Sequence, residues 1–384
     1  MKKTPALHAV ALAACAFTSA QAADLGNGVT VDVSGYGTVA ATTTNNDQLE
    51  FRSKASRSKG VGQSIDLGND SRFGIQAVVK FNADLSVTGQ LVGQRRMTGA
   101  EDADFGRDKD FDPQVEWLYA QYNALPSLNL RLGRVVLPAF LLSDSLNVGY
   151  AAPWLRAPLH LYSSQLMSNL DGVQANWRDS FGGVNLSAQA TYGKAEAYGV
   201  LPHFSTTGPV GAFHIDSKDT YAFSATAEYR DWTARVGTVR LNTPFTGIPG
   251  IEPTIHDKYV SAGLQYDNGS ALVLTEWARR TQNAMPFVGK VIEGKYAYVA
   301  AGWRFGSVLP MVIWSKADNE MMGGTDKTHP SSVGVSLRYD VAPNIALKAQ
   351  IDQYKANDPE AFVTPDATSQ HKVSVFSLGA DFVF

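Results

Sequence analysis

Charged residues at alternating positions are the groups in this chain that can do chemistry. Several segments alternate between apolar and polar residues with a period of two, and the charges fall on their polar side. The basic members slightly outnumber the acidic ones: Arg72, Lys80, Arg131, Arg178, Arg230, Arg235, Arg304, Arg338 and Lys348 against Asp32, Glu116, Glu228, Glu276, Asp340, Asp352 and Asp381. Such a surface attracts and orients ions and polar solutes without breaking bonds.

Catalysis is the second chemistry to weigh. The histidines beyond residue 22 all fall in predicted loops or at a loop edge: His160, His203, His214, His256, His329 and His371. None lies inside an alternating segment beside a serine, as acyl transfer on a strand would require. The pairs His214/Asp216 and His256/Asp257 are of a kind that occurs often by chance. We expect no enzymatic activity and no cofactor.

One acidic run is a candidate for Ca²⁺ or Mg²⁺. It comprises Asp102, Asp104, Asp108, Asp110 and Asp112. Gly106 is out of register for an EF-hand loop, so the pattern favours a solvated charge run. We expect no metal site.

The composition narrows the class of protein. The 384 residues carry 33 Lys and Arg against 36 Asp and Glu, a net charge of −3, with a mean hydropathy of −0.14. Neither a nucleic-acid-binding surface nor a disordered acidic chain has this balance. The chain has one cysteine, Cys15, so no disulfide framework is possible within it.

The first residues are typical of an export signal. Lys2 and Lys3 precede an apolar stretch at 9–17, and Ala20-Gln21-Ala22 is a small-x-small cleavage site. We expect a signal peptide at 1–22 and one domain at 23–384. An alternative is a lipoprotein signal with Cys15 as the lipidated residue.

Period-two alternation dominates the rest of the chain and predicts β-hairpins. Seven short turns can be placed, at residues 82–84, 124–127, 179–183, 231, 267–269, 306 and 341–344. Seven hairpins, with lone strands at 29–41 and 373–384, give sixteen strands. Between the hairpins lie longer polar segments: 42–70, 95–114, 134–168, 194–219, 240–257, 279–292, 316–331 and 355–371.

Short turns at one end and long loops at the other are expected of a transmembrane β-barrel, because lipid forbids an unpaired sheet edge. The last outward residue before each turn is aromatic: Phe81, Tyr122, Trp177, Tyr229, Tyr266, Phe305 and Tyr339. This series predicts a girdle at one membrane interface. We therefore expect an all-β fold, a sixteen-stranded antiparallel transmembrane barrel with short periplasmic turns and long extracellular loops; a soluble β-sandwich is the alternative.

Several segments resemble the trimeric, sixteen-stranded general porins of Gram-negative bacteria. Residues 71–75 with 85–90 are similar to their second and third strands, and Leu132-Gly133-Arg134 to the end of the fifth. Residues 335–340 with 344–348 are similar to a late hairpin, and the terminal Phe384 resembles an outer-membrane insertion signal.

The resemblance implies an outer-membrane homotrimer, in contact with lipid and lipopolysaccharide, that passes small hydrophilic solutes. It also implies that loop 134–168 narrows the channel, with Arg72 and Arg134 on a basic wall facing Asp144. Strict alternation instead turns Arg134 outward, so either a bulge intervenes or Arg131 is the lining residue. We expect Arg72, Arg131, Arg134, Asp144, Arg156 and Glu116 to line the constriction, with weak anion preference or none.

Two other functions stay open. An aromatic lining built from Phe140, Tyr150 and Trp154 would make a solute-selective channel. A lumen blocked by residues 134–168 would make a structural or adhesive barrel.

Overall fold

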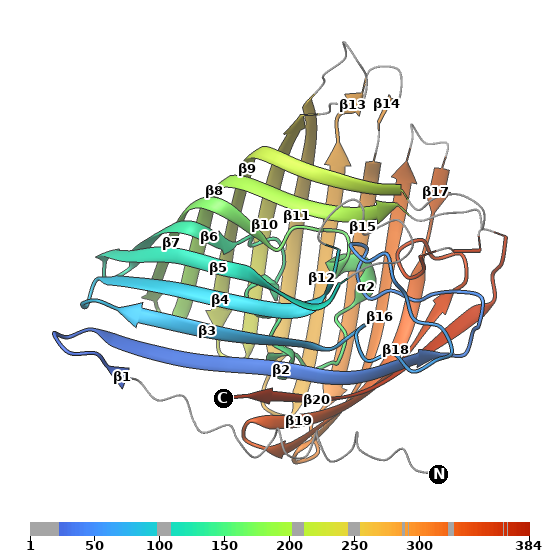
Figure 1. Ribbon diagram of the computed structural model, residues 1–384, viewed down its shortest axis with the longest axis horizontal. Coiled ribbons are helices and arrows are strands. Elements are labelled where there is room, and N and C mark those ends of the chain that lie inside the picture. Colours follow the sequence, from blue (N-terminus) through green and yellow to red (C-terminus); the bar gives the residue numbers. More distant parts are fainter. Residues whose placement is uncertain are drawn as a thin grey trace.

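A computed structural model gives the fold of the chain (Figure 1). The structure describes residues 23–97, 109–201, 211–244, 254–285, 289–290, 292–321, 326–363, 365–366 and 368–384. The expected signal peptide at 1–22 and the acidic residues Asp102, Asp104 and Asp108 lie outside the described residues.

Sixteen long antiparallel strands form one closed barrel, as the alternation predicts. Each pairs with two neighbours, and β2 closes the ring by pairing with both β3 and β20. The strands are β2 (Thr30–Thr44), β3 (Arg72–Lys80), β4 (Leu85–Arg96), β5 (Lys109–Leu125), β6 (Leu128–Val136), β7 (Asn169–Phe181), β8 (Val184–Leu201), β9 (Gly211–Tyr229), β10 (Trp232–Pro244), β11 (Thr254–Asp267), β12 (Ala271–Gln282), β15 (Ile292–Trp303), β16 (Val308–Met321), β18 (Ser331–Ala342), β19 (Ile345–Lys355) and β20 (Lys372–Val383).

Short elements accompany the barrel strands. They are β1 (Ala23–Asp24), β13 (Ala284–Met285), β14 (Gly289–Lys290), β17 (Asp326–Thr328), the 3₁₀ turns η2 (Ser143–Ser145) and η3 (Gly149–Ala151), and α2 (Leu159–Tyr162). In the described part of the chain, no helix is long and apolar enough to cross a bilayer.

All seven expected turns separate consecutive strands, but the strands at the opposite end run further than predicted. The segment 194–219, expected as a loop, is mostly a ladder in which Leu201 still pairs with Gly211. Polar side chains alternate along this extension, and backbone pairing continues wherever two antiparallel strands stay in register.

The two faces of the barrel differ as expected. Leu132, Leu378 and Phe305 are among the most exposed apolar side chains and point outward, while Asp381 and Ser377 point inward and are buried. Five of the seven expected girdle residues are exposed large side chains: Phe81, Tyr122, Tyr229, Phe305 and Tyr339. The outer wall is therefore apolar, with an aromatic band near the short turns.

The seam between β2 and β20 depends on glycines. Gly35 exchanges two backbone hydrogen bonds of 2.9 Å with Phe384. The ring of Phe384 lies over Gly35 and the ring of Phe382 over Gly37, so a Cβ at either glycine would collide with a ring. The terminal aromatics thus fit a strip of bare backbone on the first long strand. This end of β20 lies at the short-turn end, where Val383 bonds to Asn344, close to the start of β2.

Replacing Gly37 with leucine should weaken the seam, because the ring of Phe382 would have to move. We expect a loss of about 1–3 kcal/mol in the free energy of unfolding, the usual effect of overpacking, measured by urea titration in detergent. Gly62→Leu is the control, since the nearest atom to a Cβ there is 3.9 Å away. Equal stability of the two variants would show that the ring does not need a bare backbone.

Candidate pore constriction

The segment 137–168, between β6 and β7, folds into the barrel; we call it the constriction loop. Figure 1 shows α2 of this loop inside the ring of strands. Its beginning crosses to the opposite wall, where Ser261 donates a hydrogen bond of 2.7 Å to the carbonyl of Ala139. Glu276 on β12 then accepts the backbone N–H of Leu141 at 2.7 Å and the hydroxyl of Tyr162. One buried carboxylate thereby holds both ends of the loop.

Lys348 on β19 fixes the middle of the loop. Its ammonium donates to the carbonyls of Gly149 and Ala152, each at 2.7 Å, and to that of Trp154 at 3.1 Å. The same ammonium forms a buried ion pair with Asp381 at 2.7 Å. All of the donor capacity of this lysine is directed to the loop and to one acid, so it is not a free charge in the lumen.

Arg156 is the strongest electrostatic anchor. Its guanidinium pairs with Asp70 and Asp352, each at 2.6 Å, and donates to Ser377 at 2.7 Å. Burial disfavours a charged guanidinium, but the two carboxylates outweigh it and raise the pKa of Arg156. In the same way, Arg156 overcomes the effect of burial on Asp70 and lowers the pKa of that carboxyl. Both shifts favour the ionised forms of Arg156 and Asp70.

His160 in α2 forms a serine–histidine–aspartate arrangement. Its Nδ1 lies 2.7 Å from the hydroxyl of Ser315 and its Nε2 lies 2.8 Å from a carboxylate oxygen of Asp358. The set is fully buried, which leaves no room for a substrate. Burial opposes protonation of the ring, but the negative charge of Asp358 outweighs it and raises the pKa of His160. The arrangement anchors the loop to the wall.

The apolar residues of the loop pack against the wall. Trp154 is 1% exposed and contacts Tyr298 edge to face at 5.8 Å, and Phe140 is also buried. Tyr150 donates its hydroxyl to the carbonyl of Pro343 at 2.6 Å. The wall opposite contributes a layer of inward aliphatic side chains: Leu272, Leu274, Leu309, Met311 and Ile313. The loop thus fills one side of the lumen and leaves the other side open.

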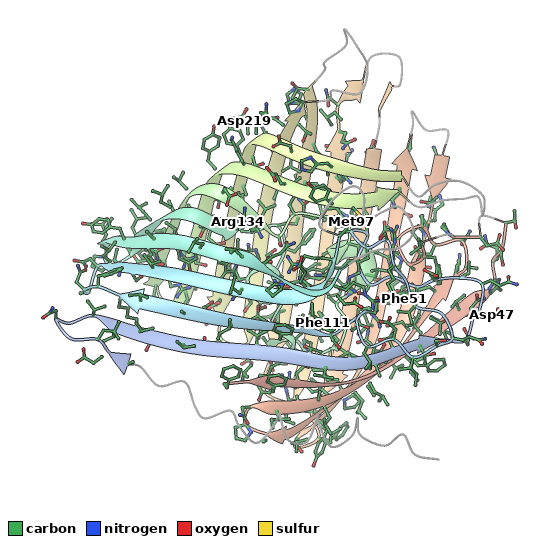
Figure 2. All side chains as sticks on the ribbon, in the orientation of Figure 1. Asp47, Phe51, Met97, Phe111, Arg134 and Asp219 are labelled. Carbon is green, nitrogen blue, oxygen red and sulfur yellow. The ribbon has the colours of Figure 1, made fainter. Side chains whose placement is uncertain are left out.

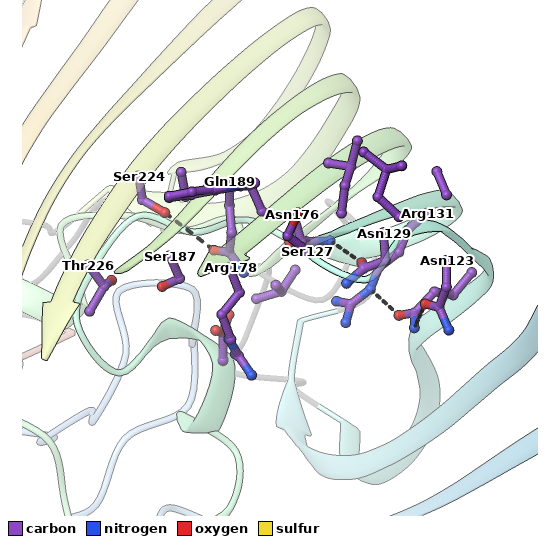
Figure 3. Close-up of a pocket in the computed structure, with 18 of the residues that line it drawn as sticks. Asn123, Ser127, Asn129, Arg131, Asn176, Arg178, Ser187, Gln189, Ser224 and Thr226 are labelled. Carbon is purple, nitrogen blue, oxygen red and sulfur yellow. Dashed lines mark hydrogen bonds between the residues drawn. The ribbon is translucent and has the colours of Figure 1, made fainter. Parts of the chain in front are cut away.

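Two cavities lie on either side of the loop. The upper one, of about 440 Å³, includes residues of the segments 54–56 and 163–169 near the long-loop end. The lower one, of about 1090 Å³, includes the short turn 124–127 (Figure 3). Trp117 on β5, Val136 at the end of β6 and Asp144 in η2 line both cavities. We call these three residues the neck, because they border both cavities.

Five basic and four acidic residues line the upper cavity: Lys54, Arg95, Arg96, Arg134 and Lys194 with Glu116, Asp144, Asp171 and Glu196. Lys54 donates to Gln94 at 3.0 Å, and Arg96 lies 3.9 Å from the carboxylate of Glu116. Glu116 is buried and accepts the hydroxyl of Ser168 at 2.6 Å. Burial, and then the guanidinium groups nearby, lower the pKa of Lys54 to about 7.

The lower cavity is lined by amides, hydroxyls and charges (Figure 3). Arg131 donates to the amide oxygens of Gln121 at 2.9 Å and Gln174 at 3.3 Å, and Arg235 donates to the carbonyl of Pro138 at 3.2 Å. Three arginines and three acids line this cavity: Arg131, Arg178 and Arg235 with Asp84, Asp144 and Glu228. None of these arginines forms an ion pair with a described acid.

Arg72 and Arg134, both expected on the basic wall, have different surroundings in the structure. Arg72 is half-buried and donates to the carbonyl of Asn147 at 2.9 Å, so it supports the constriction loop. Arg134 pairs directly with Leu118, which is exposed on the outer face, and forms two hydrogen bonds of 2.7 Å with Asp171, but it also lines the upper cavity. The alternation that places Arg131 on the lumen side ends here, because the consecutive residues Val135 and Val136 are both buried.

The other expected residues also differ in their surroundings. Asp144 is exposed at the neck, Glu116 lines the upper cavity and Arg156 is buried in its ion pairs.

Sequence reasoning missed Trp117, Lys54 and other lining residues. In β5 a bulge at position 116 lets Glu116 and Trp117 both line the cavity, a departure from alternation without a sequence signal. In the part of the chain that the structure describes, no cluster of acidic, histidine or cysteine side chains is suited to a metal ion.

Arg156→Met should release part of the constriction loop, because it leaves the carboxylates of Asp70 and Asp352 buried without a counter-charge. Breaking a buried ion pair costs about 3–5 kcal/mol, so we expect protease cuts within 137–168, mapped by mass spectrometry, that wild type resists. Arg134→Met is the control, since its exposed pair contributes about 0–1 kcal/mol. A loop equally protected in both variants would contradict the anchoring role.

Comparisons with known proteins agree with this architecture. The sequence model of the Gram-negative porin family matches residues 9–359. One similar solved structure is OmpT of Vibrio cholerae, with a TM-score of 0.57, 13% sequence identity and coverage of 95% of this chain and 100% of that chain. Another is an anion-selective porin of Comamonas acidovorans, with a TM-score of 0.56, 13% identity and coverage of 93% of this chain and 100% of that chain. A third is OmpF of Salmonella typhi in complex with daunomycin, with a TM-score of 0.59, 12% identity and coverage of 95% of this chain and 100% of that chain. At these identities the structures establish a shared fold; a search of curated proteins finds no match. With its family match and its closed sixteen-stranded barrel, the chain belongs to the Gram-negative porins, channels of the outer membrane.

Proposed function

We propose that this porin passes small hydrophilic solutes and ions by passive diffusion through the neck. The observation that carries the proposal is that two polar cavities, one toward each end of the barrel, share Trp117, Val136 and Asp144 as lining residues. Because the constriction loop packs its apolar side chains against the wall, the open side keeps charged and amide groups. Solutes on this path exchange water for protein hydrogen bonds instead of entering an apolar layer.

We propose little or no charge selectivity. The lower cavity has three arginines and three acids, and the upper cavity has five basic and four acidic residues. Opposite charges on facing walls give a transverse field that orients dipolar solutes, whereas an excess of one sign would concentrate ions of the other. Anion selectivity is a property of the Comamonas acidovorans porin with the same fold; here the acid at the neck opposes it.

We also propose an export signal and a trimeric membrane form. A signal peptide at 1–22 would direct export, and a homotrimer in contact with lipid and lipopolysaccharide would be the membrane form; a Vibrio cholerae OmpT structure of the same fold is a trimer. A solute-binding aromatic slide is not supported, because Phe140 and Trp154 are buried against the wall.

Single-channel recording in planar bilayers tests the proposal directly. We expect discrete, ohmic current steps that do not saturate with salt concentration. Absence of steps from correctly folded protein would favour the occluded structural barrel. Conductance that saturates and is blocked by one solute would favour a selective channel.

Charge at the neck should set the reversal potential in a salt gradient. Asp144→Asn removes the acid and should shift permeability toward anions, whereas Arg131→Gln should shift it toward cations. Arg279→Gln is the matched control: Arg279 pairs with the exposed Val260 on the outer face, lines neither cavity, and its loss should change nothing. If Asp144→Asn and Arg131→Gln leave the reversal potential unchanged, these residues do not lie on the ion path.

The upper cavity should gain positive charge as the pH falls from 8 to 6. Lys54, with its pKa lowered to about 7, is largely neutral above that value and charged below it. Anion permeability should therefore rise on acidification, measured by the reversal potential at each pH. Glu360, whose pKa burial raises to about 7, titrates in the same range but lies beside Asn319 away from the neck. Lys54→Met should abolish the change; its persistence would assign it to another group.

A further inference from the structure

A third, smaller cavity lies between the segment 45–71 and the constriction loop. Its volume is about 60 Å³, and both segments contribute to its lining. The two segments are packed together beside it: Phe51, labelled in Figure 2, shares a buried apolar cluster with Leu159 of α2, and the guanidinium of Arg156 lies 4.6 Å from the centre of the Phe51 ring. Four residues border both this cavity and the upper cavity: Lys54, Leu146, Tyr162 and Ser163.

The lining of the small cavity is strongly basic. Four cations and, among the described lining residues, one acid surround it: Lys54, Arg57, Arg72 and Arg156 with Asp70. The carboxylate of Asp70 accepts two hydrogen bonds from Arg156, at 2.6 and 3.2 Å. It also accepts the hydroxyl of Thr42 at 2.8 Å and the amide of Asn69 at 3.0 Å. A carboxylate has about four acceptor sites, so Asp70 has none left for the other cations.

Lys54 and Arg72 therefore lack a counter-charge. Lys54 donates to the amide oxygen of Gln94 at 3.0 Å, and Arg72 donates to the carbonyls of Asn147 at 2.9 Å and Asp70 at 3.4 Å. Neither cation forms an ion pair with any residue that the structure describes. Neutral oxygens satisfy a few donors but bring no negative charge, and a cation withdrawn from water without one is costly.

The charges around Lys54 have the same excess. Arg57 on its own segment, Arg72 on β3 and Arg96 on β4 face it, against Glu116 on β5. Glu116 is also shared with Arg96, at 3.9 Å. Burial and the three guanidinium groups lower the pKa of Lys54 to about 7, although Glu116 opposes the shift. Without a further negative charge, this ammonium gives up its proton near neutral pH.

We propose that the small cavity binds a tetrahedral inorganic oxyanion, sulfate or phosphate. Its oxygens accept hydrogen bonds from Lys54 and Arg72, and the hydroxyls of Ser53, Ser145 and Ser163 also line the space. One water needs about 10–15 Å³ of such space, so about 60 Å³ holds roughly the four oxygens of this anion. An organic acid such as gluconate is too large, and a halide is too small to contact both segments. The bound anion joins the segment 45–71 to the constriction loop.

Calorimetry of the folded porin in detergent tests the proposal, with sodium sulfate as the probe at pH 6 in a sodium gluconate background of constant ionic strength. We expect saturable binding at one site. Lys54→Met should weaken it about tenfold or more, the usual effect of losing a charge-assisted hydrogen bond. Lys194→Met is the matched control, because Lys194 lines the upper cavity but not the small one. Phosphate should compete with sulfate, whereas chloride at the same ionic strength should not.

The affinity for sulfate should fall between pH 6 and pH 9. Lys54 loses its charge over this range, whereas sulfate and the arginines that face Lys54 keep theirs. Lys54→Met should therefore bind weakly at every pH. Sulfate should also slow hydrogen exchange at the turn where the N–H of Arg57 donates to the carbonyl of Lys54, at 3.1 Å, in wild type but not in Lys54→Met.

Several results would overturn the proposal. They are the absence of saturable binding, equal affinity of wild type and Lys54→Met, displacement of sulfate by chloride but not by phosphate, and an equal loss in Lys194→Met. The heat-dependent gel shift of the barrel confirms folding; if Lys54→Met does not fold, Lys54→Gln and the pH dependence of wild type decide. None of these readouts uses conductance, so failure here leaves the channel proposal standing.

Discussion

Backbone hydrogen bonding is the constraint on which the rest of this structure depends. An apolar bilayer offers no partner for an unpaired N–H or C=O, so a sheet can cross it only as a closed ring. In this porin the ring closes between β2 and β20, where Gly35 and Gly37 admit the rings of Phe384 and Phe382. Closing sixteen strands makes an interior too wide for wall side chains to fill. The size of the ring therefore creates both the channel and the need to narrow it.

Buried charge determines where the constriction loop lies. Taking Arg156, Asp70 and Asp352 out of water is costly, and their mutual attraction offsets this only when every partner is in place. Lys348 adds the same requirement by bonding three loop carbonyls and Asp381. Apolar side chains can shift against one another at little cost, whereas buried ion pairs and hydrogen bonds require one geometry. We therefore attribute the position of the constriction loop to these charged groups. The open side of the lumen keeps its charges in contact with solvent.

Local pattern was enough to predict the barrel but not the neck. The period of two identifies outward and inward faces, and turn residues mark the seven hairpins; both depend on neighbours in sequence. Arg131 could be assigned to the lumen on that basis, and it lines the lower cavity. The roles of Arg156 and His160 depend on Asp352 and Asp358, nearly two hundred residues away. The bulge at Glu116, which exposes Trp117 to the lumen, has no local signature in the sequence.

A single cysteine at the neck tests the central claim most directly. The natural chain has one cysteine, Cys15, so an Asp144→Cys variant with Cys15 absent or replaced by serine carries one reactive thiol. A small charged thiol reagent, added to either side of a planar bilayer during single-channel recording, should reduce the current in permanent steps. The account predicts reaction from both sides, because Asp144 lines both cavities. Reaction from one side only, or from neither, would contradict a continuous path through Trp117, Val136 and Asp144.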